Sequence, residues 1–293
     1  MEINRPVFII GTGRCGSTAF HRLLVRHPEV AFLSGLLEKY PQRLYLNSWL
    51  MRALEIPLLA PAARKVLPSE CWNLWDMYGI GGACRDLAAE DVTPAMKERL
   101  REILSRFLTA GRNRLVVKLT GWPRIGYFRE IFPDAKFIHI IRDGRAVANS
   151  LLNIGWWQGW KGPENWGFGP LPDRYSREWE RYHRSFAALA GIEWMILMDS
   201  FREASAGLDR TDYLELRYED LCREPAGRIR EVTDFCGLSF TESFQSEIRS
   251  FPSFENRNYK WRQQLTRRQQ QILSELLREH LEHYGYPEDL QDG

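Results

Sequence analysis

Residues suited to holding an anion cluster close to the N-terminus, in segment 11–18, which reads GTGRCGST. The members that could contact an anion are Gly13, Arg14, Cys15, Gly16, Ser17 and Thr18. The glycines let the backbone turn tightly and aim its N–H groups at one point, while the arginine adds a cation and the last two residues add hydroxyls. An apolar run precedes the segment and a helical pattern follows it, so the positive end of a helix would face the same anion. The segment therefore predicts a site for a phosphate-like group.

Two common phosphate-binding patterns overlap with this segment, and each lacks a residue that its chemistry requires. The glycines satisfy G-x-G-x-x-G, but a dinucleotide site needs an acidic residue after the second strand, where this chain has Ser34. They also satisfy the start of G-x-x-x-x-G-K-[ST], but Ser17 replaces the lysine that contacts terminal phosphates. A third interpretation, a metal-free cradle for a 5′-phosphosulfate, uses every residue present, because a sulfuryl group carries less negative charge than a phosphoryl group.

A second pair of anion-binding side chains follows the apolar run 136–141. Arg142 comes directly after this predicted strand, at the end where ligands gather in open parallel sheets. Ser150 lies a little over two helical turns later and can return to the same side. An arginine and a hydroxyl in this arrangement suit a second phosphate. Two structural alternatives stay open: Arg142 could pair with a carboxylate, and Ser150 could be an ordinary helix residue.

The elements that must position these residues alternate between strands and helices. Short apolar runs predict strands at 6–10, 30–33, 115–119, 136–141 and 213–217. Helical spacing predicts helices at 16–26, 94–110, 144–152, 175–206, 225–236 and 266–284, with Thr93 as a helix cap before Pro94. Alternation of this kind is typical of an α/β fold, a P-loop-like parallel β-sheet with helices on both faces. We expect one domain over 1–293, with a mainly helical insertion at 36–110 and a Trp- and Gly-rich loop or lid at 153–173.

Composition limits the classes of protein to which the chain could belong. Its 293 residues are 44% hydrophobic and 27% charged, which is enough apolar material for a core. A net charge of +2 disfavours a general nucleic-acid-binding or polybasic membrane surface. Five cysteines without a C-x-x-C pair suit free thiols in a reducing compartment, so we expect a cytoplasmic protein. No apolar run is long enough for stable membrane insertion.

Four stretches occur in an order that resembles one family. They are GRCGST (13–18) with HPEV (27–30), FPDAKFIHIIRDGRAVANS (132–150), RYEDL (217–221) and YKW (259–261). Together they resemble the sulfotransferases that use 3′-phosphoadenosine-5′-phosphosulfate (PAPS), among them the tyrosylprotein-type and related bacterial enzymes. The resemblance spans residues 6 to 266 and implies transfer of a sulfuryl group to a hydroxyl or amine, with no metal ion.

The resemblance also implies roles for particular residues. Arg14 and the amides of residues 15–18 would bind the 5′-phosphosulfate, and Arg142 with Ser150 would bind the 3′-phosphate. Lys118, at the end of a strand, resembles the family lysine that steadies charge on the transferred group. Three further side chains or segments would contact or cover the donor, namely Tyr218, the stretch Tyr259, Lys260 and Trp261, and the surrounding segment 253–266. Packing of Tyr218 on the core and a solvated loop at 259–261 are the structural alternatives.

The general base is the point at which the resemblance fails. An acceptor hydroxyl needs a carboxylate or histidine to take its proton. Tyrosylprotein-type relatives have a glutamate soon after the HP-x-V stretch, whereas the first carboxylate here is Glu38, about one helical turn late. Cytosolic relatives have a histidine where this chain has Thr120. Glu38 and, as the alternative, His183 are the candidates, although each could equally be a surface residue.

The acceptor is not identified by the sequence. Four tryptophans at 156, 157, 160 and 166 could stack on a small molecule, glycan or lipid, or could pack the loop onto the domain. Two other functions also remain open. A nucleotide kinase or NTPase would bind ATP with magnesium, which the missing loop lysine disfavours. A catalytically inactive sulfotransferase-like protein would bind the nucleotide without turning it over.

Overall fold

A five-stranded parallel sheet forms the centre of the molecule. The computed structural model describes residues 1–77, 80, 83–252 and 254–286. Its strands are β1 (Val7–Ile10), β2 (Val30–Phe32), β3 (Arg114–Lys118), β4 (Lys136–Ile141) and β5 (Tyr213–Arg217), in the order β2-β3-β1-β4-β5. All four neighbouring pairs are parallel. The predicted α/β fold with a parallel sheet is therefore confirmed, and each predicted strand is present within one residue of its expected ends.

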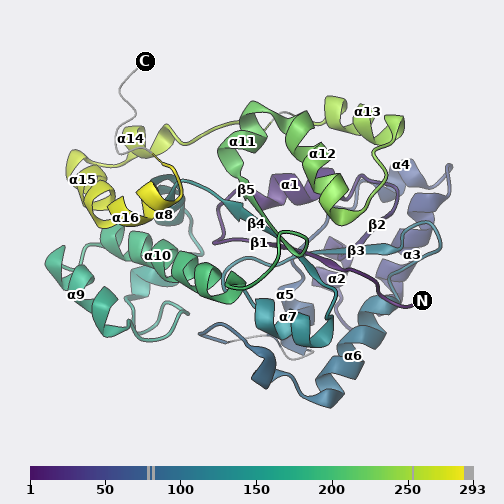
Figure 1. Cartoon of the computed structure of the whole chain (residues 1–293), viewed down its shortest axis with the longest axis horizontal. Coiled ribbons are helices and arrows are strands. Elements are labelled where there is room, and N and C mark those ends of the chain that lie inside the picture. Colours follow the sequence, from purple (N-terminus) through teal and green to yellow (C-terminus); the bar gives the residue numbers. More distant parts are fainter. Residues whose placement is uncertain (78–79, 81–82, 253, 287–293) are drawn as a thin grey trace.

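Helices surround the sheet. Between β1 and β3 lie α1 (Ser17–Leu24), α2 (Gly35–Lys39), α3 (Leu44–Glu55), α4 (Ala60–Ala63), α5 (Trp72–Met77) and α6 (Pro94–Ser105). Between β3 and β5 lie α7 (Ile125–Ile131), α8 (Gly144–Leu152), α9 (Asp173–Arg181) and α10 (Phe186–Ser205). After β5 come α11 (Tyr218–Arg223), α12 (Pro225–Cys236), α13 (Glu242–Ser250), α14 (Lys260–Gln264), α15 (Arg267–Leu276) and α16 (Arg278–His283). Two 3₁₀ turns, η1 (Ala89–Asp91) and η2 (Gln158–Lys161), lie in the longer connections. Helices α1 and α12 lie on one side of the sheet, and α5 and α7 on the other (Figure 1).

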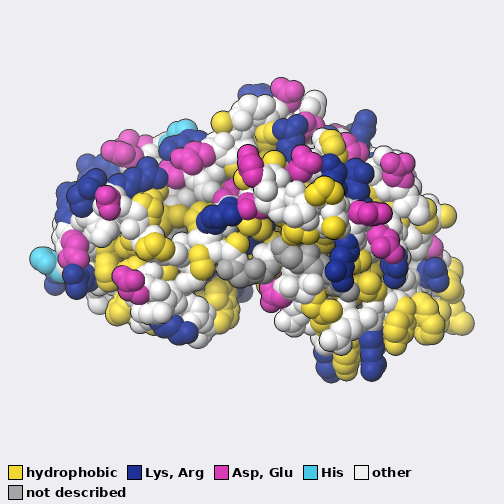
Figure 2. Space-filling model, turned by 90° about the horizontal axis from the view of Figure 1, so that it is seen from below, with side chains coloured by type: hydrophobic (Ala, Val, Ile, Leu, Met, Phe, Trp, Pro, Cys, Tyr) yellow, Lys and Arg dark blue, Asp and Glu magenta, His cyan; other side chains and the backbone are white. Residues whose placement is uncertain are grey.

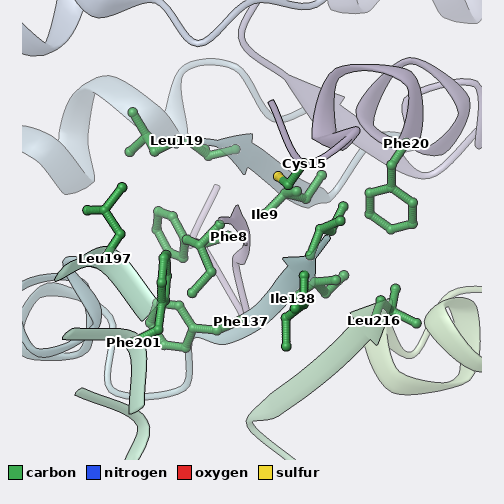
Figure 3. Packing of buried hydrophobic residues seen from close by; sticks show 14 of the residues in the cluster. Phe8, Ile9, Cys15, Phe20, Leu119, Phe137, Ile138, Leu197, Phe201 and Leu216 are labelled. Carbon is green, nitrogen blue, oxygen red and sulfur yellow. The ribbon is translucent and has the colours of Figure 1, made fainter. Parts of the chain in front are cut away.

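The strands are apolar on both faces because both faces are covered. Phe8 on β1 pairs in register with Phe137 on β4, and their rings stack 5.6 Å apart on the side where Phe201 of α10 lies (Figure 3). The next pair, Ile9 and Ile138, points the other way, toward α1. All of these side chains are fully buried. Continuous apolar runs in the sequence reflect this two-sided burial.

Two long helical predictions were wrong in the same way. Segment 175–206 forms two helices, because His183 and Arg184 between them adopt left-handed backbone angles, with φ of 53° and 57°. The indole N–H of Trp179 donates to the carbonyl of Ser185 across this break, at 3.3 Å. Segment 266–284 is likewise interrupted, at Leu277, and the helix predicted over 94–110 ends at Ser105. Neither break contains a glycine or proline from which the sequence could have predicted it.

Helix α8, which begins next to the predicted second anion site, packs closely on α10. A methyl group added at Gly144 would lie 2.7 Å from two ring carbons of the fully buried Trp194. We expect Gly144→Ala to lower the free energy of unfolding by about 1–3 kcal/mol, because the buried indole ring has to shift. Urea denaturation would measure the loss. Gly155→Ala is the matched control, since its added methyl group would meet open space; equal effects of the two substitutions would contradict this packing argument.

Candidate functional site

The chemistry-bearing residues gather where the central strands end. Because neighbouring parallel strands end at the same edge of the sheet, segment 11–18 after β1, Lys118 at the end of β3, and Arg142 after β4 share one rim. Tyr218 follows β5 at the same edge. These residues come from four different parts of the sequence, and the sheet order brings them together.

The loop after β1 has the backbone of a tight anion-binding turn. Gly13, Arg14 and Gly16 all take left-handed angles, with φ of 74°, 53° and 91°. Helix α1 begins at Ser17, so the N–H groups of Ser17 and Thr18 belong to the first turn and have no acceptor within the helix. The side chain of Cys15 is fully buried, which leaves only its backbone N–H for a ligand. The loop therefore offers N–H groups rather than a thiol.

Two constraints require glycine at position 16: its left-handed backbone angle and the close approach of the Tyr218 ring. A β-carbon there would lie 2.3 Å from the ring of Tyr218, so this ring packs directly against the loop backbone. The guanidinium carbon of Arg142 lies 4.7 Å from the centre of the same ring. The Tyr218 hydroxyl donates to the carbonyl of Glu255. Tyr218 thus links the loop, the arginine after β4 and the C-terminal segment.

Two arginines lie together at this rim. Arg14 Nε donates to Ser150 Oγ at 2.9 Å, and Arg142 donates through Nη1 to the carbonyl of Arg14 at 2.8 Å and through Nε to Asn258 Oδ1 at 2.9 Å. Burial lowers the pKa of the Arg14 guanidinium, and the nearby charge of Arg142 lowers it further. Neither arginine forms an ion pair with a carboxylate among the residues that the structure describes. The two cations therefore create a local excess of positive charge.

Lys118 adds a third cation from the neighbouring strand. Its Nζ donates to Thr18 Oγ1 at 2.8 Å and lies 2.6 Å from Glu70 Oε1. Glu70 in turn accepts from the Thr120 hydroxyl at 3.1 Å and from the Trp72 indole N–H at 2.8 Å. Lys118 is 6% exposed, so this network holds a nearly buried ammonium group beside the start of α1.

A cavity of about 570 Å³ opens next to the loop. It is lined by Thr12, Gly13, Thr18, Glu38, Pro68, Ser69, Glu70, Trp72, Lys118, Thr120, Gly121, Leu151, Trp156, Phe168 and Glu193. Aromatic and apolar side chains make up one part of this wall, and three carboxylates make up another. The cavity therefore joins the cationic loop to a space in which a partly apolar molecule could lie.

The three carboxylates differ in their surroundings. Glu38, on α2, is half-buried and accepts one side-chain hydrogen bond, from Ser69 Oγ at 3.3 Å. Glu70 is held by Lys118, Thr120 and Trp72 as described above. Glu193, on α10, is 4% exposed and accepts from the indole N–H of Trp157 at 2.7 Å. Burial raises the pKa of Glu193 to about 7, so this carboxyl group holds its proton far more readily than an exposed glutamate.

Several residues selected from the sequence do not face the cavity. His183 is exposed at the break between α9 and α10, and it does not line the cavity. Tyr259 is 48% exposed, and Lys260 begins α14 with a half-buried side chain. Trp261 is buried, with the guanidinium of Arg145 4.9 Å from its ring centre. The C-terminal segment reaches the arginines through Asn258 instead.

The tryptophan-rich stretch combines both of its possible roles. Trp157 and Trp166 are 4% and 2% exposed and fix the stretch to the domain. Trp156 and Trp160 are 57% and 48% exposed, and Trp156 lines the cavity. Two of the four tryptophans therefore pack against the domain, and the exposed ring of Trp156 faces the cavity.

Three site residues were not selected from the sequence. Glu70 and Asn258 carry no local signal, because each is defined by partners more than forty residues away. Glu193 does carry one: it is the one charged residue within the apolar run FAALAGIEWMILM of α10. A carboxylate in such a run is costly to bury and often marks a functional site.

This combination of a parallel sheet, a glycine-containing anion loop and cations from adjoining strand ends is typical of P-loop-like α/β proteins, which hold an anionic group at this edge of the sheet. The chain matches the profile of the sulfotransferase family over residues 6–242, and it belongs to that family. It is 28% identical to the omega-hydroxy-beta-dihydromenaquinone-9 sulfotransferase Stf3 of Mycobacterium bovis, over 96% of this chain and 75% of that protein. It is also 28% identical to a protein-tyrosine sulfotransferase of Drosophila melanogaster, over 50% of this chain and 25% of that protein.

Solved structures agree on the fold. Sulfotransferase STF9 from Mycobacterium avium superposes with a TM-score of 0.59 at 15% identity, over 97% of this chain and 77% of that one. The sulfotransferase domain of the Synechococcus PCC 7002 olefin synthase gives a TM-score of 0.50 at 20% identity, over 98% and 96% of the two chains. At these identities the likeness is one of architecture.

Two kinds of feature are absent from the described part of the chain. Within it, no three or more His, Cys, Asp or Glu side chains are grouped as metal ligands. No helix in the same residues has the length and apolar character needed to cross a membrane.

The protonation of Glu193 gives a stability prediction. Its pKa of about 7 in the folded protein exceeds the ordinary value of 4.5, so the folded state binds this proton more tightly than the unfolded chain. The free energy of unfolding therefore falls as pH rises between these two values, and this contribution is largest below 4.5. We expect Glu193→Gln to remove about 3 kcal/mol of that pH dependence. Urea denaturation at about pH 5 and about pH 8 would measure it. Glu164→Gln, at an exposed position, is the control, and an unchanged pH dependence in Glu193→Gln would contradict the prediction.

Proposed function

We propose that this member of the sulfotransferase family transfers a sulfuryl group from PAPS to a hydroxyl or amine of an apolar acceptor. The observation that carries the proposal is the placement of Arg14 and Arg142 a single hydrogen bond apart, with no carboxylate among the described residues to neutralise them. A donor with anionic groups at its 3′ and 5′ ends would supply the missing negative charge. The family match supports the reaction type.

Each end of the donor has candidate ligands. The N–H groups of residues 15–18 and the Arg14 side chain would hold the 5′-phosphosulfate. Arg142 and Ser150 would hold the 3′-phosphate, and Tyr218 would lie beside the nucleotide. Because Arg14 already donates to Ser150, the two sites adjoin, and Arg14 is within reach of both. The segment 253–266 would cover the donor, with Asn258 as its contact to Arg142.

The transfer itself requires charge stabilisation and proton removal. The acceptor oxygen or nitrogen would form a bond to sulfur while the bond between sulfur and the 5′-phosphate oxygen breaks, leaving 3′,5′-ADP. Lys118, held at the start of α1 by Thr18, would stabilise negative charge on the leaving phosphate. The acceptor's proton would pass to a cavity carboxylate. This route uses side chains alone and needs no divalent ion.

Glu38 is our candidate for the base. It lines the cavity with a single side-chain hydrogen bond, whereas the Glu70 carboxylate is paired with Lys118. Thr120 donates its hydroxyl proton to Glu70 and is not a base. His183 lies outside the cavity, so we do not assign it a catalytic role.

An apolar acceptor fits the cavity. Trp72, Leu151, Trp156 and Phe168 line it, and Phe168 also lines an adjoining cavity of about 630 Å³. One relative, Stf3, is named a sulfotransferase of omega-hydroxy-beta-dihydromenaquinone-9, a menaquinone derivative that carries a hydroxyl group. The odd number of cysteines, five without a C-x-x-C pair, suits a reducing compartment, and we propose the cytoplasm.

Removal of the charge on Arg142 tests the donor site. We expect Arg142→Ala to weaken binding of 3′,5′-ADP by about 1.5–3 kcal/mol, the scale of a hydrogen bond to a charged group. Binding of 5′-AMP should change much less, because it lacks the 3′-phosphate. Isothermal titration calorimetry would measure both ligands, with Arg181→Ala on the exposed face of α9 as the control. Equal affinity of the wild-type protein for the two nucleotides would contradict a 3′-phosphate site, and binding of ATP that depends on magnesium would favour a kinase or NTPase.

Substitution of the cavity carboxylates tests the base. We expect Glu38→Gln to lower kcat by about 10²- to 10⁴-fold, because the acceptor proton loses its acceptor, while 3′,5′-ADP still binds normally. Glu70→Gln should instead disturb Lys118 and weaken both turnover and donor binding. Turnover of labelled PAPS against a panel of apolar alcohols, phenols and amines would measure kcat. A kcat that is unchanged in Glu38→Gln would exclude this residue, and absence of turnover in the wild type across a broad panel would favour a binding protein.

A further inference from the structure

A second cavity, of about 390 Å³, lies away from the donor loop. It is lined by Arg22, Val25, Arg26, Phe32, Leu54, Arg64, Val66, Leu67, Pro68, Arg112, Glu247, Phe251 and Pro252. Its α1 residues come from the C-terminal end of that helix, whereas the donor loop adjoins the N-terminal end. Pro68 alone is shared with the 570 Å³ cavity. This second cavity is therefore a separate place on the molecule.

The charge of this cavity is strongly positive. Four of its lining residues are arginines and one is a glutamate. The Glu247 carboxylate contacts two of them, Arg64 at 2.8 Å and Arg26 at 3.1 Å. The side chain of Arg22 forms no hydrogen bond or ion pair with any described residue. One carboxylate thus faces four guanidinium groups, and the balance of charge favours an anion.

Arg112 is the buried member of this group. It is 4% exposed, and its Nη1 donates to the carbonyls of His27, at 3.3 Å, and Val30. Its Nε is buried and has no hydrogen-bond acceptor in the part of the chain that the structure describes. Burial lowers the pKa of Arg112 to about 10, while the charge of Glu55 opposes this shift. The Glu55 carboxylate is itself occupied by the N–H groups of residues 111 and 112 and by the Thr109 hydroxyl. A buried cation with an unused donor is costly unless a ligand supplies the acceptor.

The rest of the cavity wall is apolar, and it continues onto an apolar surface. Leu54, at the cavity, is followed by a turn in which Ile56, Leu58 and Leu59 are 46%, 88% and 46% exposed. Leu67 lines the cavity and is 49% exposed. Figure 2 shows hydrophobic and basic side chains intermingled at its right-hand end, where Figure 1 places α3 and α4. An anion bound here would have apolar side chains around it and beside it.

We infer that this cavity binds an amphipathic anion, that is, a carboxylate, sulfate or phosphate group carried on an apolar chain. The acidic group would lie against Arg22 and the part of the Arg112 side chain that lines the cavity. The chain would contact Leu54 and Phe251 and leave over Leu67 toward the exposed turn. Glu247 would compete with the ligand, because its carboxylate already engages two of the arginines. This inference does not depend on the proposed reaction.

Calorimetric titration with octyl sulfate tests the site, with saturating 3′,5′-ADP present to fill the donor site. We expect saturable binding of octyl sulfate and little or no binding of octanol or octyltrimethylammonium. Arg22→Ala should weaken octyl sulfate about tenfold, since it removes one charge-assisted contact. Glu247→Gln should strengthen it, because the competing charge is gone. Arg249→Ala, an exposed residue on α13 that does not line the cavity, should leave the affinity unchanged.

Three results would overturn the inference: no saturable binding, equal binding of the cationic amphiphile, or an affinity that is unaffected by both Arg22→Ala and Glu247→Gln. The last result would place octyl sulfate elsewhere on the protein. The source of the ligand is distinguished by sedimentation with vesicles of phosphatidylglycerol and phosphatidylcholine. Cosedimentation that requires phosphatidylglycerol and is lost in Arg22→Ala would support a membrane lipid. Binding of octyl sulfate without cosedimentation would support a free anion.

Discussion

The structure of the site depends on positive charge that the protein itself leaves unbalanced. Arg14 and Arg142 lie next to each other at the ends of adjacent strands, and the second donates to the backbone carbonyl of the first. Two partly buried cations repel each other, and neither has a carboxylate partner among the described residues. The fold holds them in place through Ser150, Asn258 and the ring of Tyr218. Such an arrangement is stabilised most by a ligand that carries negative charge at two points.

Lys118, unlike the two arginines, has a carboxylate partner among the described residues. Its ammonium group is nearly buried and is neutralised by Glu70, so it adds little to the net charge that attracts a donor. Its contact with Thr18 nevertheless places it beside the first turn of α1. The loop has Ser17 where an NTPase loop has its lysine, and Lys118 from the neighbouring strand lies beside the same helix start. In the proposed reaction, Lys118 would keep a cation near the transferred group without the sequence pattern of an NTPase.

The sequence predicted the parts of this site that local patterns determine. Apolar runs located all five strands, and residues next to their ends supplied the arginines and the lysine. What it could not predict depends on contacts between distant residues. Glu70 belongs to the site only because it meets Lys118, and Asn258 only because it meets Arg142. The break at His183 has no glycine or proline to mark it, and the side-chain hydrogen bond that spans it joins Trp179 to the carbonyl of Ser185.

The three carboxylates of the cavity differ in their surroundings, and this difference gives one residue type three different properties. Burial keeps a proton on Glu193 up to about neutral pH, so at lower pH this group can donate a hydrogen bond and carries no charge. The ion pair with Lys118 commits Glu70 to balancing the charge of that lysine. Glu38 has neither constraint: it is half-buried and holds one hydrogen bond, from a serine. Environment alone therefore separates the three, and it favours Glu38 as the group that takes the acceptor's proton, even though the sequence placed it one helical turn late.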